Sequence, residues 1–520
     1  MTARKTIAPA VSKGPCPKPS LGHSPAVIIR ERVRRNPPEK IGRREAAATK
    51  KTPTLAVSKD WKKVEIEFSG GPLIVRVPPD CAVLAMAKAE VLPDPAAAIR
   101  TAYERPIAGP TLAEIVRSKK KPAASLRAAI TVSDITRPVP YRGRQGILAP
   151  LLETLLGRGL RRENIRIIVG TGTHRASTAA EKMAMFGRQV VSAFKILDHD
   201  CADASSMVSI GRTEGGTEVR INRVFQEADL KIATGLTESH FMAGASGGRK
   251  AVCPGLVDLK TIHKFHSPEF LENPKATNLV LEGNPCHEEA RGVARMVGLD
   301  FAVTVTMDRA MRLTGVFAGE MDAVLEAAVA CIKTYTAIPV EKPFDIVLTH
   351  GGYVGRNHYQ TAKAAVGAIP AVREKGVIII AADNRDEEPI GGSEYKTLCH
   401  LLKLQGPDGY LHTLKSPSWR FTKDQWEPEV WGKVLRRVGE DGLIYCGPDI
   451  PGESCFRLPG RSGYEFLPPS ARRLGRVRKA ELMVQNALIA SYQSLAASGI
   501  NSRVAFLPEG PYAVPVSTGE

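Results

Sequence analysis

Short apolar runs alternate with segments of helical periodicity along most of this chain. Residues 127–132, 165–169 and 230–233 are apolar runs of strand length, and residues 147–156 carry apolar side chains at helical spacing. Residues 178–181 read T-x-x-E, a capping box that begins a further helix. This alternation predicts an α/β fold with parallel-rich sheets.

Similar patterns flank this region on both sides. Before it, residues 62–77 predict two strands around Gly70 and Gly71, followed by helices at 93–100 and 112–117. After it, a second α/β block begins near Lys342. Its predicted elements are a strand at 345–349, a helix at 361–375, a strand at 377–382, a helix at 479–497 and a strand at 504–507.

These patterns predict how the chain divides into domains. At 520 residues the chain is too long for one typical hydrophobic core. We expect a disordered basic tail at 1–55 and an N-terminal α/β domain at 56–335. A C-terminal α/β domain at 342–475 and a closing helix and strand at 476–520 complete the expected order.

The composition is that of a soluble globular protein, with 43% hydrophobic and 24% charged residues. No stretch reaches the roughly 18 consecutive apolar residues of a membrane helix. The first residues carry positive charge without an apolar segment, so no secretory signal is expected. Nine scattered cysteines form no CxxC pair, which disfavours a disulfide framework or a cysteine zinc site. We therefore expect a cytoplasmic protein that does not contact membranes.

The net charge of +18 is concentrated at one end of the chain. Residues 1–51 hold 13 Lys and Arg against 3 Glu in a Pro-rich segment without a hydrophobic period. Such a tail is either a solvated extension or a segment that touches nucleic acid or another acidic surface. The remaining charge is modest for the rest of the chain, so nucleic acid is not expected to bind outside the tail.

Two generic motifs are incomplete and a third is absent. GTGTHR begins like a dinucleotide fingerprint, but Arg175 stands where the third glycine belongs. GASGGRKA resembles a P-loop, yet Arg249 replaces the glycine before the lysine and Ala251 replaces Ser or Thr. The sequence contains no HExxH. A dehydrogenase or another nucleotide-using α/β enzyme therefore remains only as an alternative hypothesis.

Polar residues collect just beyond several predicted strands. Loop amides and helix N-termini converge at the carboxyl edge of an open α/β sheet, where ligands bind. Clusters of His, Arg and Lys at that edge predict a site for an anionic ligand and for proton transfer. The residues concerned are Asp134, Arg137, His174, His240, Lys250, Gln360 and Lys363.

Together these segments closely resemble the lactate racemase family that depends on a nickel-pincer nucleotide. The resemblance runs through SDITRPVP, GTGTHR, HFMAGASGGRKAVCPG, HKFHS, NHYQTAK and DQW, over roughly residues 60–510. The segment around Lys250 is the most specific part. Its spacings of ten residues from His240 and sixteen to His266 also fit the family.

The resemblance implies two α/β domains with the active site between them, and racemisation or epimerisation of a 2-hydroxy acid. It further implies a pyridinium mononucleotide joined to Lys250 through a thioamide. Nickel is then bound by one carbon and two sulfurs of the cofactor and by His266. From the residues themselves, Asp134 either caps the turn before Pro138 and braces Arg137 or serves the cofactor, and Gly247 and Gly248 either permit positive φ or let the backbone approach the nucleotide phosphate. The implied partners are the substrate and the proteins that make and insert the cofactor.

The residue types suit this chemistry on physical grounds. Inversion at a carbinol carbon by hydride transfer requires removal of the hydroxyl proton on either face, and histidine titrates near neutral pH. His174 and His240 are therefore the candidate acid/base groups. Arg137 and Lys363 are candidates to bind the carboxylate, and Gln360 is a candidate to orient the substrate. Tyr359 and Trp426 are expected to wall the pocket.

Other residues are interpreted as structural or as departures from the family. His199 and His263 are expected to have structural or supporting roles. Arg356 lies in GGYVGRN, which differs from the PLDQ-like stretch of lactate-specific members. Its added positive charge raises the alternative of a larger or dianionic substrate.

Overall fold

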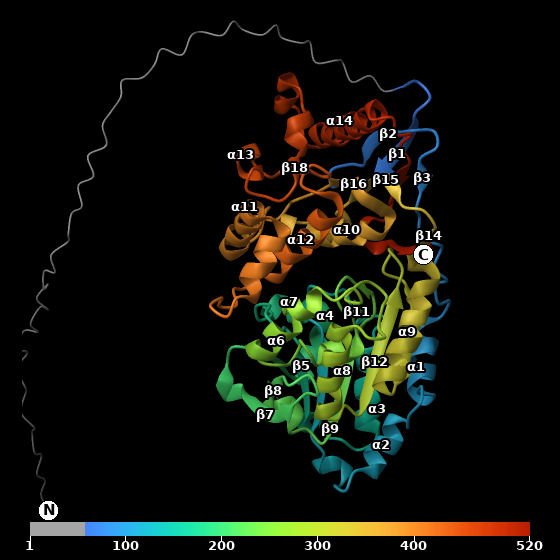
Figure 1. Cartoon of the computed structure of the whole chain (residues 1–520). Helices are drawn as coiled ribbons and strands as arrows, with labels where there is room; N and C mark the ends of the chain where they lie inside the picture. The colour runs from blue at the N-terminus through green and yellow to red at the C-terminus, as the bar shows by residue number, and fades with distance from the viewer. Residues whose placement is uncertain (1–57, 520) are drawn as a thin grey trace, which may run out of the picture. The chain divides into compact units, whose positions relative to one another are not determined.

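The computed structural model describes residues 58–519, so the expected basic tail lies outside the described residues. Within them the chain builds two six-stranded sheets (Figure 1). The first sheet has the order β13-β12-β9-β4-β5-β6 and the second the order β18-β17-β16-β15-β19-β3. All neighbouring strands are parallel except β13, which is antiparallel to β12. The predicted α/β class with parallel-rich sheets is confirmed.

The first sheet is covered by helices on both faces. One face packs under α1 to α4. The other packs under α5 (Arg223–Gln226), α6 (Leu259–Phe265), α7 (Pro268–Leu271), α8 and α9, so the two faces form separate apolar clusters. The strands are β4 (Ala128–Val132), β5 (Ile165–Val169), β6 (Lys195–Asp198), β9 (Leu230–Leu236), β12 (Phe301–Met307) and β13 (Leu313–Gly319). The principal helices are α1 (Pro95–Glu104), α2 (Leu112–Ser118), α3 (Leu148–Gly157), α4 (Ala179–Ala193), α8 (Pro285–Val297) and α9 (Met321–Thr336).

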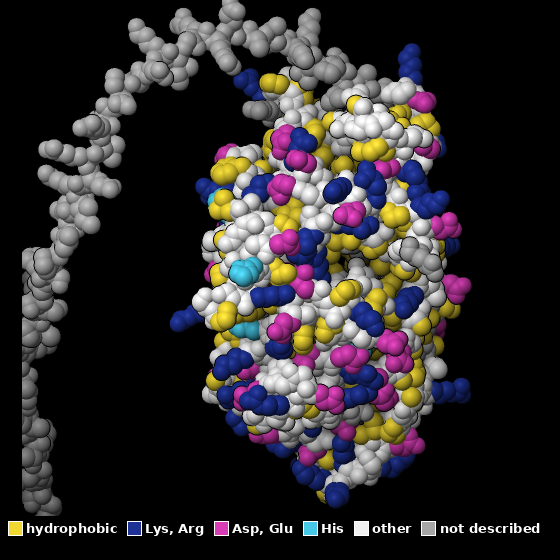
Figure 2. All heavy atoms as spheres, in the orientation of Figure 1, with side chains coloured by type: hydrophobic (Ala, Val, Ile, Leu, Met, Phe, Trp, Pro, Cys, Tyr) yellow, Lys and Arg dark blue, Asp and Glu magenta, His cyan; other side chains and the backbone are white. Residues whose placement is uncertain are grey.

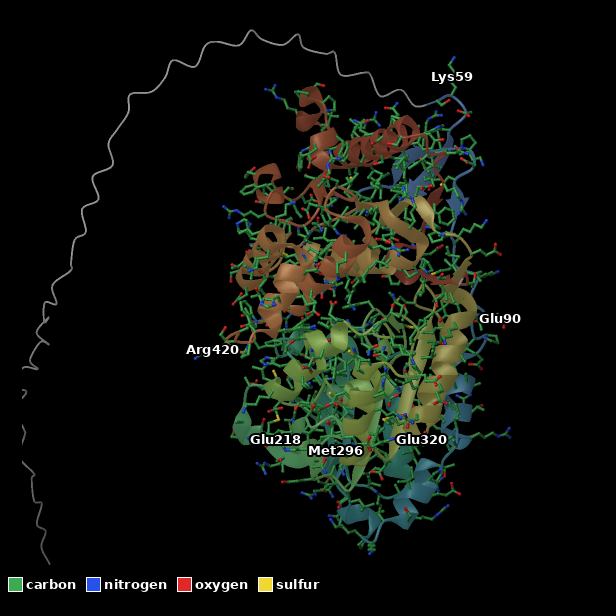
Figure 3. All side chains as sticks on the ribbon, in the orientation of Figure 1. Lys59, Glu90, Glu218, Met296, Glu320 and Arg420 are labelled. Carbon is green, nitrogen blue, oxygen red and sulfur yellow. The ribbon has the colours of Figure 1, made fainter. Side chains whose placement is uncertain are left out.

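Local sequence signals account for several of these boundaries. The Thr178 side chain accepts from the Glu181 backbone amide and the Glu181 side chain accepts in return, so the predicted capping box starts α4. Asn284 caps α8, whose last turn ends at Gly298 in the left-handed conformation. Glu320, labelled in Figure 3, caps α9 through the amide of Ala323.

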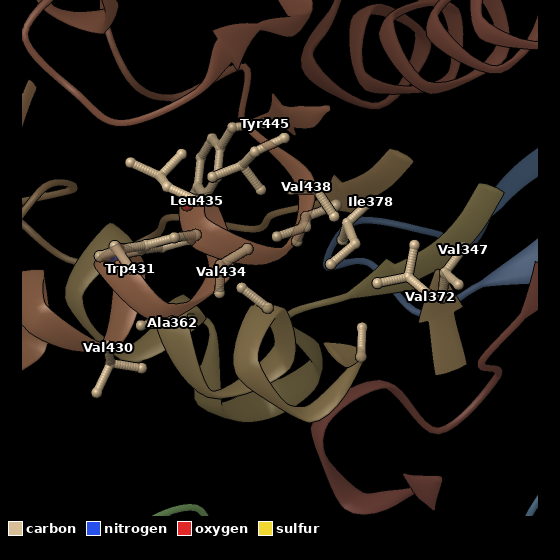
Figure 4. Packing of buried hydrophobic residues seen from close by; sticks show 14 of the residues in the cluster. Val347, Ala362, Val372, Ile378, Val430, Trp431, Val434, Leu435, Val438 and Tyr445 are labelled. Carbon is tan, nitrogen blue, oxygen red and sulfur yellow. The ribbon is translucent and has the colours of Figure 1, made fainter. Parts of the chain in front are cut away.

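The second sheet is also covered on both faces. One face carries the apolar cluster of α10, α11 and α12, part of which is drawn in Figure 4 around Trp431 and Val434. The strands are β15 (Phe344–His350), β16 (Val372–Ala381), β17 (Leu443–Cys446), β18 (Arg461–Ser462), β19 (Val504–Phe506) and β3 (Ala82–Val83). The helices are α10 (His358–Gly367), α11 (Ser393–Lys415), α12 (Trp426–Val438) and α14 (Arg476–Ala497).

The segments that cover the opposite face of the second sheet come from both ends of the described chain, which the predicted domain order did not include. The predicted hairpin β1 (Lys62–Ile66) and β2 (Leu73–Val77) is present, but it packs with α14 against the second sheet. Strand β3 pairs with β19 in the same sheet. Residues 62–83 therefore belong with the second sheet and not with the N-terminal domain predicted at 56–335. The segment 476–520 supplies a helix layer and strand β19 of that sheet, and is not a separate closing unit.

The predicted helix at 361–375 is wrong at its C-terminal end. Helix α10 starts earlier, where the Asn357 side chain accepts from the Gln360 amide, and it ends at Gly367. Pro370 has no backbone N–H to donate and its ring clashes with the preceding turn, so the helix cannot continue. The chain passes through a short turn and enters β16 at Val372.

Side-chain charges are mixed over the face drawn in Figure 2, where Lys and Arg are interspersed with Asp and Glu. No helix within residues 58–519 combines the length and apolar character needed to span a bilayer.

Gly247 occupies a place that tolerates no side chain. Its φ is +81°, and a Cβ there would lie 2.5 Å from Thr237 Oγ1 and 2.9 Å from Thr304 Oγ1. Those two hydroxyls already hydrogen-bond to each other at 2.8 Å. The loop after β9 can therefore lie this close to Thr304 on β12 only if residue 247 is a glycine.

We expect Gly247→Ala to lower the free energy of unfolding by about 2 kcal/mol more than Gly439→Ala. Gly439 has nearly the same backbone conformation, φ 76° and ψ 173° against 81° and 177°, but a Cβ at that position would have no atom within 4 Å. The pair separates lack of space from backbone strain. Urea denaturation measures both variants, and equal losses would show that space at Gly247 is not limiting.

Candidate active site

The candidate site lies where the strand order of the first sheet reverses. The chain proceeds from β4 to β5 on one side and later returns to β9 on the other side of β4. Asp134 and Arg137 follow β4, His174 follows β5, and His240 follows β9. Such a switch point leaves a crevice at the carboxyl ends of the strands, which is the usual ligand site of open α/β sheets.

Asp134 and His174 form a hydrogen-bonded pair in this crevice. His174 Nδ1 lies 2.6 Å from Asp134 Oδ2, and Asp134 Oδ1 accepts from the amide and hydroxyl of Thr136. Burial alone would raise the pKa of Asp134, but these hydrogen bonds and the charges of His174 and Arg137 outweigh it and lower that pKa. An ionised carboxylate only accepts, so the His174 proton is on Nδ1 and Nε2 is left as a base.

His174 is also the more open of the two partners. Its side chain is 51% exposed, against 8% for Asp134. The arrangement therefore resembles an oriented general base on a half-exposed ring.

His240 and Lys250 form the second polar contact. Lys250 Nζ lies 2.9 Å from His240 Nε2, and the His240 ring stacks on Phe241 with centroids 5.0 Å apart. Burial lowers the pKa of His240 well below its usual range, and the charges of Lys250, Arg137 and Lys363 lower it further. The pKa of Lys250 is also well below its usual range, through burial and the charges of Arg249 and Arg137.

A short 3-10 helix, η4 (Gly248–Ala251), holds Lys250 in place. Arg249 is fully buried, and its Nη2 donates to the carbonyl oxygen of Ala243 at 2.8 Å. This bond ties η4 to the loop that carries His240. The predicted glycines Gly247 and Gly248 both have positive φ and shape this turn.

His266 ends helix α6 (Leu259–Phe265) with a fixed tautomer. Its Nδ1 lies 2.9 Å from the carbonyl oxygen of Ile262, which can only accept, so Nδ1 carries the proton. Burial lowers the pKa of His266 to about 3, which keeps the ring neutral. Its Nε2 lone pair is then available to a metal.

The second sheet contributes the remaining predicted residues through α10 and α12. Trp426 stacks on the His266 ring with centroids 4.5 Å apart, and its Nε1 donates to the Tyr359 hydroxyl at 3.0 Å. Lys363 Nζ donates to Gln360 Oε1 at 2.6 Å. Burial lowers the pKa of Lys363, and the charge of Arg137 lowers it further. Predicted site residues from the two sheets are therefore close enough to stack on each other and to shift each other's pKa.

Sequence reasoning missed two buried carboxyl groups at this site. Glu427 follows Trp426 directly, and burial raises its pKa while the charge of Lys363 opposes that rise. Glu238 lies two residues before His240, and burial raises its pKa against the charges of Arg137 and Lys363. Glu238 stands inside the segment TGLTESHF and Glu427 directly after DQW, but glutamate carries no signal of burial by itself.

Other predicted residues have identifiable structural partners. His199 Nε2 bonds to the carbonyl oxygen of Val257 in the core, as expected of a structural histidine. His263 stacks on Phe421 with centroids 3.4 Å apart. Arg356 Nε donates to Asp386 Oδ1 at 2.8 Å. Its positive charge is therefore compensated within the protein.

No cluster of three or more His, Cys, Asp or Glu side chains suited to a metal ion occurs within residues 58–519.

Two sequence families match the chain. The family described as Lactate racemase N-terminal domain matches residues 71–278, and that described as Lactate racemase C-terminal domain matches residues 340–440. The chain is 34% identical over 339 residues to a lactate racemase of Lactiplantibacillus plantarum, covering 65% of this chain and 77% of that protein. It is 33% identical over 340 residues to a lactate racemase of Thermoanaerobacterium thermosaccharolyticum, covering 65% and 76%.

A solved lactate racemase structure agrees with this assignment, and a second structure shares the fold alone. The lactate racemase apoprotein of Thermoanaerobacterium thermosaccharolyticum superposes with a TM-score of 0.72 at 27% identity, covering 88% of this chain and 100% of that chain. A Thermotoga maritima protein shares the fold, with a TM-score of 0.55 at 17% identity over 78% of this chain and 96% of that chain.

The fold and the site thus define an α/β enzyme of the isomerase class. The chain belongs to the lactate racemase family, as its motifs predicted.

Contacts between α7 (Pro268–Leu271) and α12 connect the elements on either side of the site. Lys433 Nζ donates to the Leu271 carbonyl oxygen, and Arg436 Nη2 donates to Glu272 Oε1 at 2.6 Å. Arg420, labelled in Figure 3, belongs to the adjoining loop between α11 and α12. Glu429 lies in the same contact, 2% exposed and with no hydrogen-bond partner for either carboxyl oxygen among the described residues.

Glu429 makes this contact sensitive to pH. Burial, together with the charge of Glu272, raises its pKa to about 8, so the folded protein holds a proton that the unfolded chain loses near about pH 4.3. The stabilisation by that proton is complete below about pH 4.3 and is lost as pH rises toward about 8.

We expect Glu429→Gln to be more stable than the parent near pH 8, with the advantage growing by at most about 1.4 kcal/mol per pH unit above about pH 5. The amide retains the neutral form at every pH. Denaturant unfolding between about pH 5 and 8 measures the difference, and Glu374→Gln at an exposed position controls for loss of charge. Parallel curves for parent and Glu429→Gln would contradict a proton held on Glu429.

Proposed function

We propose that this protein racemises lactate or a closely similar 2-hydroxy acid, using a nickel-pincer nucleotide attached to Lys250. The observation that carries the proposal is the grouping of His174, His240 and Lys250 around the Arg137 loop at the switch point of the first sheet. The names of the relatives agree with this activity.

The residues present fit the proposed cofactor. Lys250 is a partly buried amine in a glycine-shaped turn, suited to covalent attachment. His266 offers a neutral imidazole whose Nδ1 bond to Ile262 fixes the ring, a common arrangement for a metal ligand. Nickel(II) accepts imidazole nitrogen, and the remaining donors come from the cofactor in this proposal. When bound, the cofactor supplies an acceptor for the C2 hydrogen and its electron pair.

The protein's own residues bind the substrate and move its hydroxyl proton. Arg137 and Lys363 neutralise the carboxylate, and Gln360, hydrogen-bonded to Lys363, orients it. Asp134 keeps the His174 ring turned so that Nε2 accepts the hydroxyl proton. His240 acts on the same oxygen from the loop on the other side of Arg137. Tyr359 and Trp426 exclude water from one wall.

The charge balance supports a substrate with a single carboxylate. Arg356 is already paired with Asp386, so it does not provide a free cation for a second carboxylate. A dianionic acid is therefore disfavoured relative to a monocarboxylic acid such as lactate.

Two substitutions separate attachment from metal binding. We expect Lys250→Ala to abolish the covalent adduct and the activity while the fold is retained, because Lys250 lies in a glycine-shaped turn and not in an apolar cluster. We expect His266→Ala to reduce bound nickel more than bound nucleotide, since only the metal loses a ligand. Intact mass and metal analysis of protein from its native host measure both. A covalent adduct that persists in Lys250→Ala would show that another residue carries the cofactor. Unchanged bound nickel in His266→Ala would show that His266 is not a nickel ligand.

Isotope retention distinguishes hydride transfer from proton abstraction. We expect a 2-hydroxy acid deuterated at C2 to keep most of its label after racemisation in ordinary water, because the hydrogen leaves with its electron pair and returns to the same molecule. A C2 proton taken by a histidine exchanges with solvent instead. Mass spectrometry of the product enantiomer at low conversion measures retention, and extensive early washout would overturn the hydride mechanism.

A further inference from the structure

The contact between Lys250 Nζ and His240 Nε2, 2.9 Å long, has two mutually exclusive hydrogen-bond assignments. In one, a lysine ammonium donates to an unprotonated Nε2. In the other, a protonated Nε2 donates to the lone pair of a neutral lysine amine. The two assignments differ in which ring nitrogen of His240 carries the proton.

The other ring nitrogen of His240 decides between them. Nδ1 faces the backbone N–H groups of Met242 and Ala243, each at 3.4 Å. Backbone N–H groups only donate, so Nδ1 has to present its lone pair. A neutral imidazole then carries its proton on Nε2, and Lys250 is the acceptor.

The groups around Lys250 favour the same assignment. Arg249 on its own turn and Arg137 on the loop after β4 both place positive charge near it. Cys253 and Cys286 also face Lys250, but burial raises the pKa of both thiols, so they add no negative charge near neutral pH. The Phe265 ring, 5.3 Å from Nζ, and the neutral His266 ring complete the surroundings.

Arg249 holds the segments that carry Lys250 and His240 in place. It is fully buried, and its bond to the Ala243 carbonyl oxygen holds the residue whose amide faces His240 Nδ1. One side chain therefore sets both the turn that carries Lys250 and the loop that sets the His240 tautomer.

We propose that Lys250 of the unloaded protein is a neutral primary amine that accepts a hydrogen bond from His240 Nε2–H, and that it is thereby preset as the nucleophile for acylation by an activated carboxyl or thiocarboxyl compound. In that step the amine lone pair forms the new C–N bond. The carboxyl carbon releases its leaving group with the bonding electron pair, and the surplus N–H proton leaves with that group or passes to water. No separate base has to deprotonate the lysine first.

Acylation also changes His240. An acylated nitrogen has delocalised its lone pair and accepts a hydrogen bond poorly, so the Nε2–H of His240 loses its partner. Resting on the proposed function, this means that attachment of the cofactor leaves the Nε2–H of His240 free to donate a hydrogen bond to the substrate oxygen. His240 is thus a positioning residue before attachment and a hydrogen-bond donor to the substrate afterwards.

The test is competitive acetylation of the full-length unloaded protein by trace acetic anhydride over a range from about pH 5 to 11, with mass spectrometry of each lysine peptide. We expect the labelling midpoint of Lys250 to fall well below the value of about 10.4 that an ordinary lysine shows. The exposed Lys63 serves as an internal reference. A Lys250 midpoint near about 10, or no labelling of Lys250 at any pH, overturns the proposal.

The direction in which His240→Leu shifts the labelling midpoint of Lys250 tests the hydrogen-bond assignment itself. If Nε2–H donates to the amine, removing it destabilises the neutral form and raises the midpoint of Lys250. If the ammonium donates to Nε2, removing the acceptor lowers the midpoint, which would refute the proposal. Removing a neighbouring positive charge in Arg137→Gln should raise the midpoint, and Arg144→Gln at an exposed position is the matched control for charge.

These outcomes are independent of the proposed function. A low midpoint in the unloaded chain, together with no adduct on protein from the native host, refutes cofactor attachment but leaves the preset amine standing. An adduct found with an ordinary midpoint refutes the preset amine alone.

Discussion

Positive charge held away from water is the constraint on which the site depends. Arg137, Arg249 and Lys363 come from different loops and helices, yet their charges act on a common region around His240 and Lys250. Enclosed cations are costly unless they are compensated or neutralised. The protein uses both routes. Glu238 and Glu427 bring acidic groups to Arg137 and Lys363, and the imidazoles of His240 and His266 stay neutral.

The arrangement explains why the acidic groups and the histidines occur together. A site made only of cations would repel the protons that its acid/base groups must carry, while a site with full compensation would not attract a carboxylate. Asp134 is the exception because its hydrogen bonds keep it ionised, and it is paired with the more exposed histidine. The two histidines therefore lie in different surroundings: His174 is hydrogen-bonded to a carboxylate, and His240 faces a lysine.

Much of the first sheet and most of the site could be predicted from the sequence because the signals are local. An apolar run, a polar loop and a capping box place β5, His174 and α4 without reference to distant residues. Glu427 could not be predicted in this way, since its burial depends on α10 packing against α12. The location of β1, β2 and β3 was missed for the same reason. A hairpin has the same sequence pattern whichever sheet it packs on. The hairpin packs with α14 and β3 pairs with β19, and both of these partners lie at the other end of the described chain.

The pairing of these distant segments also affects how the molecule is made. Arg76 on β2 donates its backbone amide to Gln485 on α14, 409 residues away, while the strands of the first sheet lie between the two. During synthesis the first sheet can assemble while the β1–β2 hairpin still lacks its covering helix α14 and β3 still lacks its partner strand β19. The apolar face of the hairpin and the edge of β3 then stay exposed until α14 and β19 have left the ribosome, and such exposed surfaces are where chains aggregate. The interval between the two events, set by the length of the intervening chain, is therefore the period in which a nascent molecule most needs a chaperone.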